Sequence, residues 1–137
     1  MSDDGMYRRC SVRCAAKDAD LFREIGFKTT CLEEDGATAF LFRDDCDAPN
    51  DPGVLGIATS GVPFTGVVAS HSECKAERFC TDDGGIMAAP SESDGELIVR
   101  IDDDGIVNSG DVSYAKWFLQ VCRDADSLIE ARTAEEG

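Results

Sequence analysis

Apolar and polar residues alternate along segment 7–14, as they do in a β-strand that buries one face. Cys10, Val12 and Cys14 fall on one side of such a strand, and polar side chains fall on the other. We therefore expect the first element of the chain to be a strand that lies half-buried in a sheet.

The next segment, 17–27, has apolar residues three or four positions apart, which is typical of a short helix packed on one side. Asp18 is suited to cap the start of this helix, and Gly26 suits the left-handed turn that ends many helices. Phe27 is then expected to pack back against Phe22.

The middle of the chain is rich in short β-like segments. Residues 28–33 and 37–43 predict a hairpin with its turn at 35–36. The second of these strands is apolar on both faces, so we expect it in the interior of the sheet. Residues 54–59 and 64–70 are two further apolar segments, which we interpret as strands.

The last third of the chain contains the clearest element. Residues 81–95 are rich in Gly, Ser, Pro and Asp, which favours an exposed loop. Residues 96–101 alternate between apolar and polar and predict a strand. From Asp111 to about Arg132 the apolar residues recur at helical spacing, which predicts a long C-terminal helix.

This order of elements predicts an α+β fold in one domain over residues 1–137. We expect a mainly antiparallel sheet, with a short N-terminal helix and a long C-terminal helix packed on one face. Tyr114 and Trp117 of the long helix are expected in the core or at its edge, with an interface as the alternative. Ferredoxin-like, acetyltransferase-like and glyoxalase-like folds share the opening order, so the order indicates no activity.

The chain is strongly acidic, with 13 Lys and Arg residues against 28 Asp and Glu residues and a formal net charge of −15. The excess is local, because residues 29–111 hold four basic and eighteen acidic residues. Such a field repels phosphates, so we expect no direct binding to nucleic acid or to anionic membranes. Arg8, Arg9 and Arg13 are expected to pair with this acidic segment rather than bind an anion.

Seven cysteines occur in a chain whose N-terminus has no apolar leader and which has no segment of ~20 apolar residues. An odd number of cysteines without an export signal indicates reduced thiols in a cytoplasm. We therefore expect a cytoplasmic protein without disulfide bonds.

His71 and Cys74, with Cys80 further along, have part of the spacing of a zinc site. A second close pair is missing, because Cys10 and Cys14 would lie about 13 Å apart on a strand. A nucleophilic Cys74 or Cys80 with His71 as its base is a further alternative. The simplest interpretation is that the cysteines are small buried apolar residues.

Oxygen-bearing side chains follow one another closely in segment 102–111. They belong to Asp102, Asp104, Asn108 and Asp111. Calcium prefers oxygen ligands at such spacing, so the sequence predicts a site for calcium or a similar cation. The alternative is a polar turn that ends a strand, followed by a helix that Ser109 or Asp111 caps.

The same segment resembles the calcium loops of EF-hands and, more closely, those of dockerin repeats. The resemblance implies that Ile106 supplies its backbone carbonyl beside the four side chains, that Gly105 makes the sharp turn and that Val107 is buried. Two departures weaken the predicted affinity. Arg100 stands where the first ligand is expected, and dockerins carry two such repeats, whereas this chain has one.

Charge and size together predict a non-enzymatic, acidic interaction protein that occupies a basic, nucleic-acid-binding surface of a partner as an inhibitor. Small phage-encoded antagonists of host defence are similar in these respects. The oligomeric state is left open, a dimer included. The carboxylates expected to face the partner are Glu33, Glu34, Asp35, Asp44, Asp45, Asp82, Asp83, Asp102, Asp103 and Asp104.

Two alternatives to this function remain. The first is a cation-binding module that uses the loop at 102–111. The second is a small ligand-binding domain or enzyme of a widely shared fold, with its pocket between the sheet and the helices.

Overall fold

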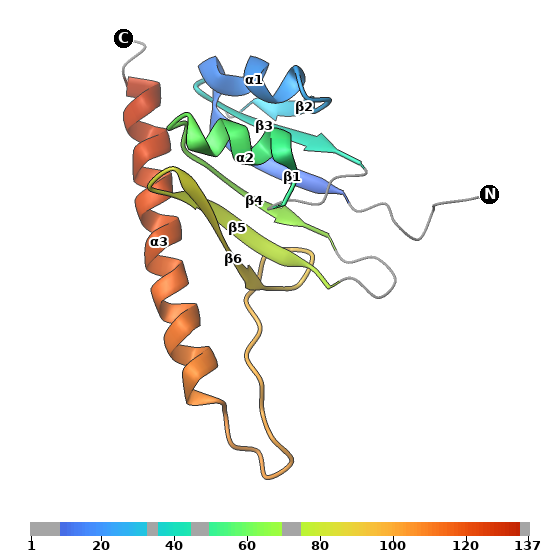
Figure 1. Ribbon diagram of the computed structural model, residues 1–137, viewed down its shortest axis with the longest axis vertical. Helices are drawn as coiled ribbons and strands as arrows, with labels where there is room; N and C mark the ends of the chain where they lie inside the picture. The colour runs from blue at the N-terminus through green and yellow to red at the C-terminus, as the bar shows by residue number, and fades with distance from the viewer. Residues whose placement is uncertain (1–8, 33–35, 45–49, 70–74, 135–137) are drawn as a thin grey trace, which may run out of the picture.

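The computed structural model describes residues 9–32, 36–44, 50–69 and 75–134. Within them, six strands form one antiparallel sheet in the order β2-β3-β1-β4-β5-β6 (Figure 1). The strands are β1 (Cys10–Ala15), β2 (Lys28–Leu32), β3 (Thr38–Arg43), β4 (Phe64–Val68), β5 (Glu77–Asp82) and β6 (Gly85–Pro90). The helices are the 3-10 turn η2 (Ala16–Asp18), α1 (Ala19–Arg23), α2 (Pro52–Thr59) and α3 (Ser109–Ala134).

The sheet and its long C-terminal helix confirm the α+β class and most of the predicted elements. β1, the β2–β3 hairpin, β4 and α3 lie where the sequence predicts them, and β3 lies inside the sheet between β2 and β1. Gly26 has the expected left-handed backbone, with φ of 100°. The rings of Phe22 and Phe27 meet edge to face at 5.3 Å.

The helices lie on both faces of the sheet, which corrects the expectation that they share one face. Along β5, Phe79 packs in the core with α1 and α2, whereas the neighbouring Cys80 packs with α3. Successive residues of a strand point to opposite faces, so α3 covers the face opposite α1 and α2. β6 follows the same alternation: Ala88 packs on the first core and Ala89 on the second.

Two ion pairs fasten α3 to the rest of the molecule. Arg132, near the end of α3, donates to both carboxylate oxygens of Asp18, at 2.5 and 2.6 Å. Arg13 of β1 donates to Asp126 at 3.1 Å. The buried carboxylate of Asp18 makes no side-chain cap on α1, contrary to the prediction, because Arg132 engages it instead.

Residues 54–59 form part of helix α2, so their prediction as a strand is wrong. The Asp51 side chain caps this helix by accepting from the Val54 amide at 3.1 Å, and Pro52 occupies its first position. Arg43 holds the cap residue through an ion pair of 2.6 Å. A short apolar segment has no periodicity that separates helix from strand, and the decisive signal lay in the cap.

Residues 81–95 were predicted as a loop, but much of this segment belongs to the β5–β6 hairpin. Asp83 and Gly84 both have positive φ, 52° and 83°, at its tight turn. The predicted strand at 96–101 is also wrong. Only the isolated bridges Ser91–Leu97 and Ile101–Val107 lie in that region of the described chain.

None of the helices in the described part of the chain combines the length and the apolar character that crossing a membrane requires.

Candidate functional site

The segment between β6 and α3, with the first turns of α3, projects from the body of the molecule (Figure 1). We call residues 96–117 the arm. Residues 101–110 are exposed without interruption, although this stretch contains Ile101, Ile106 and Val107. Such apolar side chains in a projecting segment are unusual in a chain that works alone.

The arm carries most of the exposed large apolar side chains of the described residues. Those of the arm are Ile98, Ile101, Ile106, Val107, Tyr114 and Trp117. Outside the arm, the described chain exposes Leu21, Leu55 and Leu128. The exposed fractions of Ile101 and Ile106 exceed 60%, at 61% and 64%. Tyr114 and Trp117 are less exposed, and the Tyr114 ring stacks on that of the buried Phe118. These two residues therefore lie at the edge of the core, which is one of the two positions that the sequence predicts for them.

An ion pair closes the base of the arm. Arg100 donates to both carboxylate oxygens of Asp111, through Nε at 2.8 Å and Nη2 at 2.9 Å, and its backbone N–H donates to the same group at 2.9 Å. The hydrogen bonds from the guanidinium and then from the backbone lower the pKa of Asp111 to about 2. The pair joins the extended segment to the first turn of α3.

The tip of the arm is a turn that its own side chains stabilise. The Asp102 carboxylate accepts from the amides of Asp104 and Ile106, both at 2.9 Å. Gly105 has a φ of 81°, and the Ile106 carbonyl accepts from the Asp102 amide at 3.0 Å. The turn directs Asp102, Asp103 and Asp104 into solvent together.

Asn108 caps α3, since its side-chain oxygen accepts from the Asp111 amide at 2.9 Å. Tyr114, one turn along, donates its hydroxyl to the Ala88 carbonyl of β6 at 2.7 Å and fixes the helix to the sheet. The helix cap anticipated at Ser109 or Asp111 therefore lies at Asn108.

Four of the five predicted calcium ligands, all except Asp104, already have partners within the arm. Asp102 and Ile106 hold the turn, Asn108 caps the helix, and Asp111 is paired with Arg100. The structure thus follows the alternative of a polar turn and a helix cap. The described residues hold no group of three or more His, Cys, Asp or Glu side chains placed to hold a metal ion. Calcium binding stays an untested prediction.

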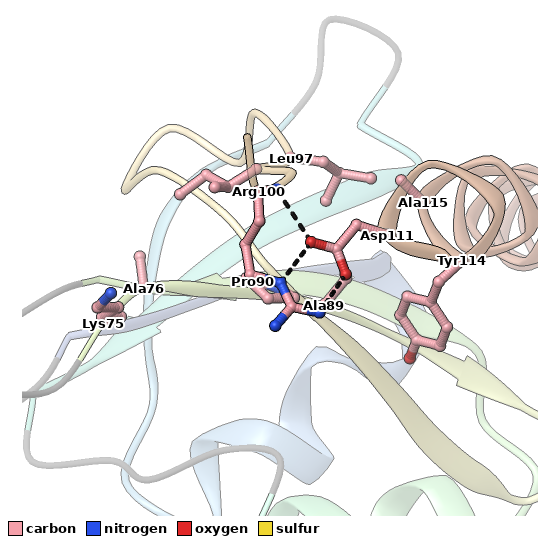
Figure 2. Close-up of a pocket in the computed structure, with 10 residues that line it drawn as sticks. Lys75, Ala76, Ala89, Pro90, Leu97, Arg100, Asp111, Tyr114 and Ala115 are labelled. Atoms are coloured by element: carbon pink, nitrogen blue, oxygen red, sulfur yellow. Dashed lines mark hydrogen bonds and ion pairs between the residues drawn. The ribbon is translucent and has the colours of Figure 1, made fainter. Parts of the chain in front are cut away.

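A pocket of about 360 Å³ lies where the arm meets the sheet (Figure 2). Its walls are mainly apolar and come from four places: residues 75–76 before β5, the end of β6, the extended segment and α3. Figure 2 shows Arg100 and Asp111 facing one another beside Ala89 and Pro90, with Tyr114 further along the helix. The pocket is open because the side chains of Ala76 and Ala89 are too small to fill it. It can accept one apolar side chain.

The acidic residues predicted to face a partner do not gather on one surface. Asp102, Asp103 and Asp104 lie together at the arm tip. Asp82 and Asp83 lie at the β5–β6 turn and line a hollow beside the later part of α3. Asp44 pairs with Arg9 at 2.9 Å, which agrees with the expected pairing of the early arginines. The remaining predicted residues, Glu33, Glu34, Asp35 and Asp45, lie outside the described residues.

The cysteines of the described chain behave mainly as core residues. Cys10, Cys14, Cys80 and Cys122 are buried, and Cys31 is exposed. The hydrogen bond with Cys122 and burial raise the pKa of the Cys80 thiol, which disfavours a nucleophilic thiolate. His71 and Cys74, the other members of the proposed zinc or catalytic group, lie outside the described residues.

The sequence pattern does not predict that residues 96–117 project from the body of the molecule. The sequence predicts a strand for Ile98 and Ile101 and a cation or partner site for the polar loop, and it leaves an interface at Tyr114 and Trp117 only as an alternative. The signal available was the presence of Ile101, Ile106 and Val107 around three consecutive aspartates, in a segment too polar to be buried. No protein-family model, curated protein or solved structure matches this chain.

Proposed function

We propose that this protein is a non-enzymatic interaction protein whose arm docks on a partner protein with a basic surface. The observation that carries the proposal is the combination on one projecting segment of six exposed large apolar side chains and a tip of three carboxylates. Tyr and Trp are among the side chains that contribute most to binding at protein interfaces.

Charge complementarity defines the partner. Asp102, Asp103 and Asp104 attract Lys and Arg side chains, whereas a second copy of this chain brings another net charge of −15. The partner therefore offers an apolar groove for Ile101, Ile106 and Trp117, bordered by basic side chains. A basic surface that normally binds nucleic acid has this character.

The pocket at the base of the arm supports a defined mode of docking. An apolar side chain of the partner fills the space beside Ala89 and Pro90, while the arm lies along the partner's surface. The Arg100–Asp111 pair at the pocket wall is already neutralised internally, so covering it leaves no unpaired charge.

Affinity capture with matched variants tests the proposal. The first arm variant carries Ile101→Ser, Ile106→Ser and Trp117→Ser, and the second carries Asp102→Asn, Asp103→Asn and Asp104→Asn. Leu55→Ser, an exposed apolar residue of α2, is the control. We expect the wild type and the control to retain the same basic protein, and both arm variants to lose it.

Salt and hydrodynamics complete the test. Retention by the wild type is expected to fall steeply as salt rises, because the tip carboxylates make screened contacts. Retention that both arm variants preserve, or an acidic protein as the retained species, would contradict the proposal. Sedimentation of the pure protein as a dimer that the apolar arm variant abolishes would make a second copy the occupant instead.

A further inference from the structure

α3 covers only part of its face of the sheet. The helix packs on β4, β5, β6 and β1, but Phe40 of β3 and Val67 of β4 are only half-buried on the same face. A hollow of about 530 Å³ opens over these residues, and the turn formed by residues 92–96 borders it. This volume lies in the range of small-molecule sites.

One side of the hollow is cationic. Arg13 of β1 and Arg78 of β5 both line it, in register with Thr65 and Val67 of the strand between them. Arg13 is paired with Asp126. Arg78 donates to the Gly95 carbonyl over a long 3.5 Å, and no carboxylate of the described residues forms an ion pair with it. A half-buried guanidinium in this state is suited to bind a carboxylate.

The acidic residues of the hollow lie next to Arg78, because they flank Gly95 in the sequence and Arg78 contacts the Gly95 carbonyl. Asp94 and Glu96 line the hollow from the turn, and the Asp94 carboxylate accepts from the Glu96 amide at 3.0 Å. Gly95, with φ of 95°, lets the turn lie against the sheet, because a Cβ there would come within 3.3 Å of the Val67 side chain. Among the described residues, neither carboxylate forms an ion pair with Arg13 or Arg78.

Beside these charged side chains, the floor of the hollow is mainly apolar and also carries hydroxyl groups. Phe40 and Val67 offer apolar surface, and Ser11 and Thr65 offer hydroxyl groups. A ligand that fits all of these features has an apolar body and, at one end, a negative group and a positive group side by side.

We propose that this hollow binds a small zwitterion with an aromatic or branched aliphatic body, such as a free amino acid. Its carboxylate binds Arg78, its ammonium group lies between Asp94 and Glu96, and its body rests on Phe40 and Val67. A zwitterion has no net charge, so the field of a chain with net charge −15 does not repel it as it repels a nucleotide or inorganic phosphate. Apart from Glu96, the residues of this site lie outside the arm, and the site does not depend on the function proposed for the arm.

Titration of the full chain with L-phenylalanine tests the site, with chemical shifts of the sheet amides and calorimetry as readouts. We expect a Kd on the order of 1 mM, as for a ligand of this size. Two analogues separate the charges: 3-phenylpropionate lacks the ammonium group and phenethylamine lacks the carboxylate. Each is expected to bind at least about tenfold more weakly than phenylalanine.

Variants assign the binding to the hollow. Arg78→Gln, and separately Asp94→Asn with Glu96→Gln, are expected to weaken phenylalanine binding by about tenfold or more. Arg123→Gln makes the same charge change as the first variant at an exposed site of α3 and is expected to leave binding unchanged. Absence of saturable binding up to about 10 mM, equal binding of either analogue, or unchanged binding by Arg78→Gln overturns the proposal.

Discussion

An ion pair between Asp and Arg contributes differently to the stability of this molecule according to how deeply it is buried. The side chain of Asp18 is only 5% exposed beneath Arg132, whereas that of Asp20 is 81% exposed beside Arg23. Water screens the second pair, so it contributes little to stability, while loss of one partner from the first leaves a largely desolvated charge.

Replacing Asp18 with Ala is therefore expected to lower the free energy of unfolding by about 3 kcal/mol, since it removes both hydrogen bonds that Arg132 donates to the buried Asp18 carboxylate and releases the end of α3 from this contact. Urea unfolding measures the change. Asp20→Ala, the matched exposed pair, is expected to alter stability by less than about 0.5 kcal/mol. Equal effects of the two substitutions would refute this assignment.

The Arg100–Asp111 pair makes stability depend on pH in a defined window. Arg100 lowers the pKa of Asp111 from 3.8 to about 2, so the unfolded chain binds this proton more readily than the folded one. The contribution of the pair is complete above pH 3.8 and is lost as pH falls towards 2. Asp111→Asn is expected to remove this part of the acid sensitivity, and a carboxyl NMR titration of Asp111 near 3.8 in the wild type would argue against the pair.

The same pair bears on calcium binding at segment 102–111. Both Asp111 oxygens accept from Arg100, so a cation at this position must displace the guanidinium. We expect calorimetric titration with calcium to give no heat and millimolar calcium to leave the Tm unchanged. Saturable heat that Asp104→Asn abolishes would restore the cation-binding function.

At the scale of elements, periodicity predicted those with clear one-sided patterns. β1, the β2–β3 hairpin and α3 follow from alternation or helical spacing alone. α2 was missed because its short apolar segment fits either state, and its start depends on Asp51 and Pro52. The β5–β6 hairpin was missed because the glycines that permit its tight turn are the composition of a loop. The arm depends on tertiary contacts, such as the Tyr114 hydroxyl with Ala88, which no local pattern encodes.

The close approach of β4 to its neighbours gives a test at this scale. A Cβ on Gly66 would lie 2.3 Å from the Ser11 carbonyl oxygen and 2.4 Å from the Phe79 ring. We expect Gly66→Ala to destabilise the fold by about 3 kcal/mol. Gly56→Ala in α2, where no other atom lies within 4 Å, is expected to stabilise it by roughly 0.5 kcal/mol. Thermal unfolding that ranks the two variants in the opposite order would exclude this packing.

At the scale of the whole molecule, exposed large apolar side chains are concentrated on the arm, whereas acidic side chains occur both there and on the body. The body has a core on each face of the sheet, and the described acidic residues predicted to face a partner lie at separate places: the arm tip, the β5–β6 turn and Asp44 beside Arg9. Within the described part of the chain, the arm brings the three carboxylates of its tip together with six exposed large apolar side chains. The net charge of the sequence predicts an acidic protein that binds a basic partner. Only the fold shows which segment combines negative charge with exposed apolar surface.

Site-directed photo-crosslinking tests docking by the arm most directly. A photoreactive residue replaces Trp117 on the arm in one protein and Leu55 on α2 in another, both exposed in the free chain. We expect position 117 to crosslink to a basic protein, with the yield falling as salt rises, and position 55 to give no such product. A crosslink from position 55 to that protein, or from position 117 only to a second copy of this chain, would contradict docking of the arm on a basic partner.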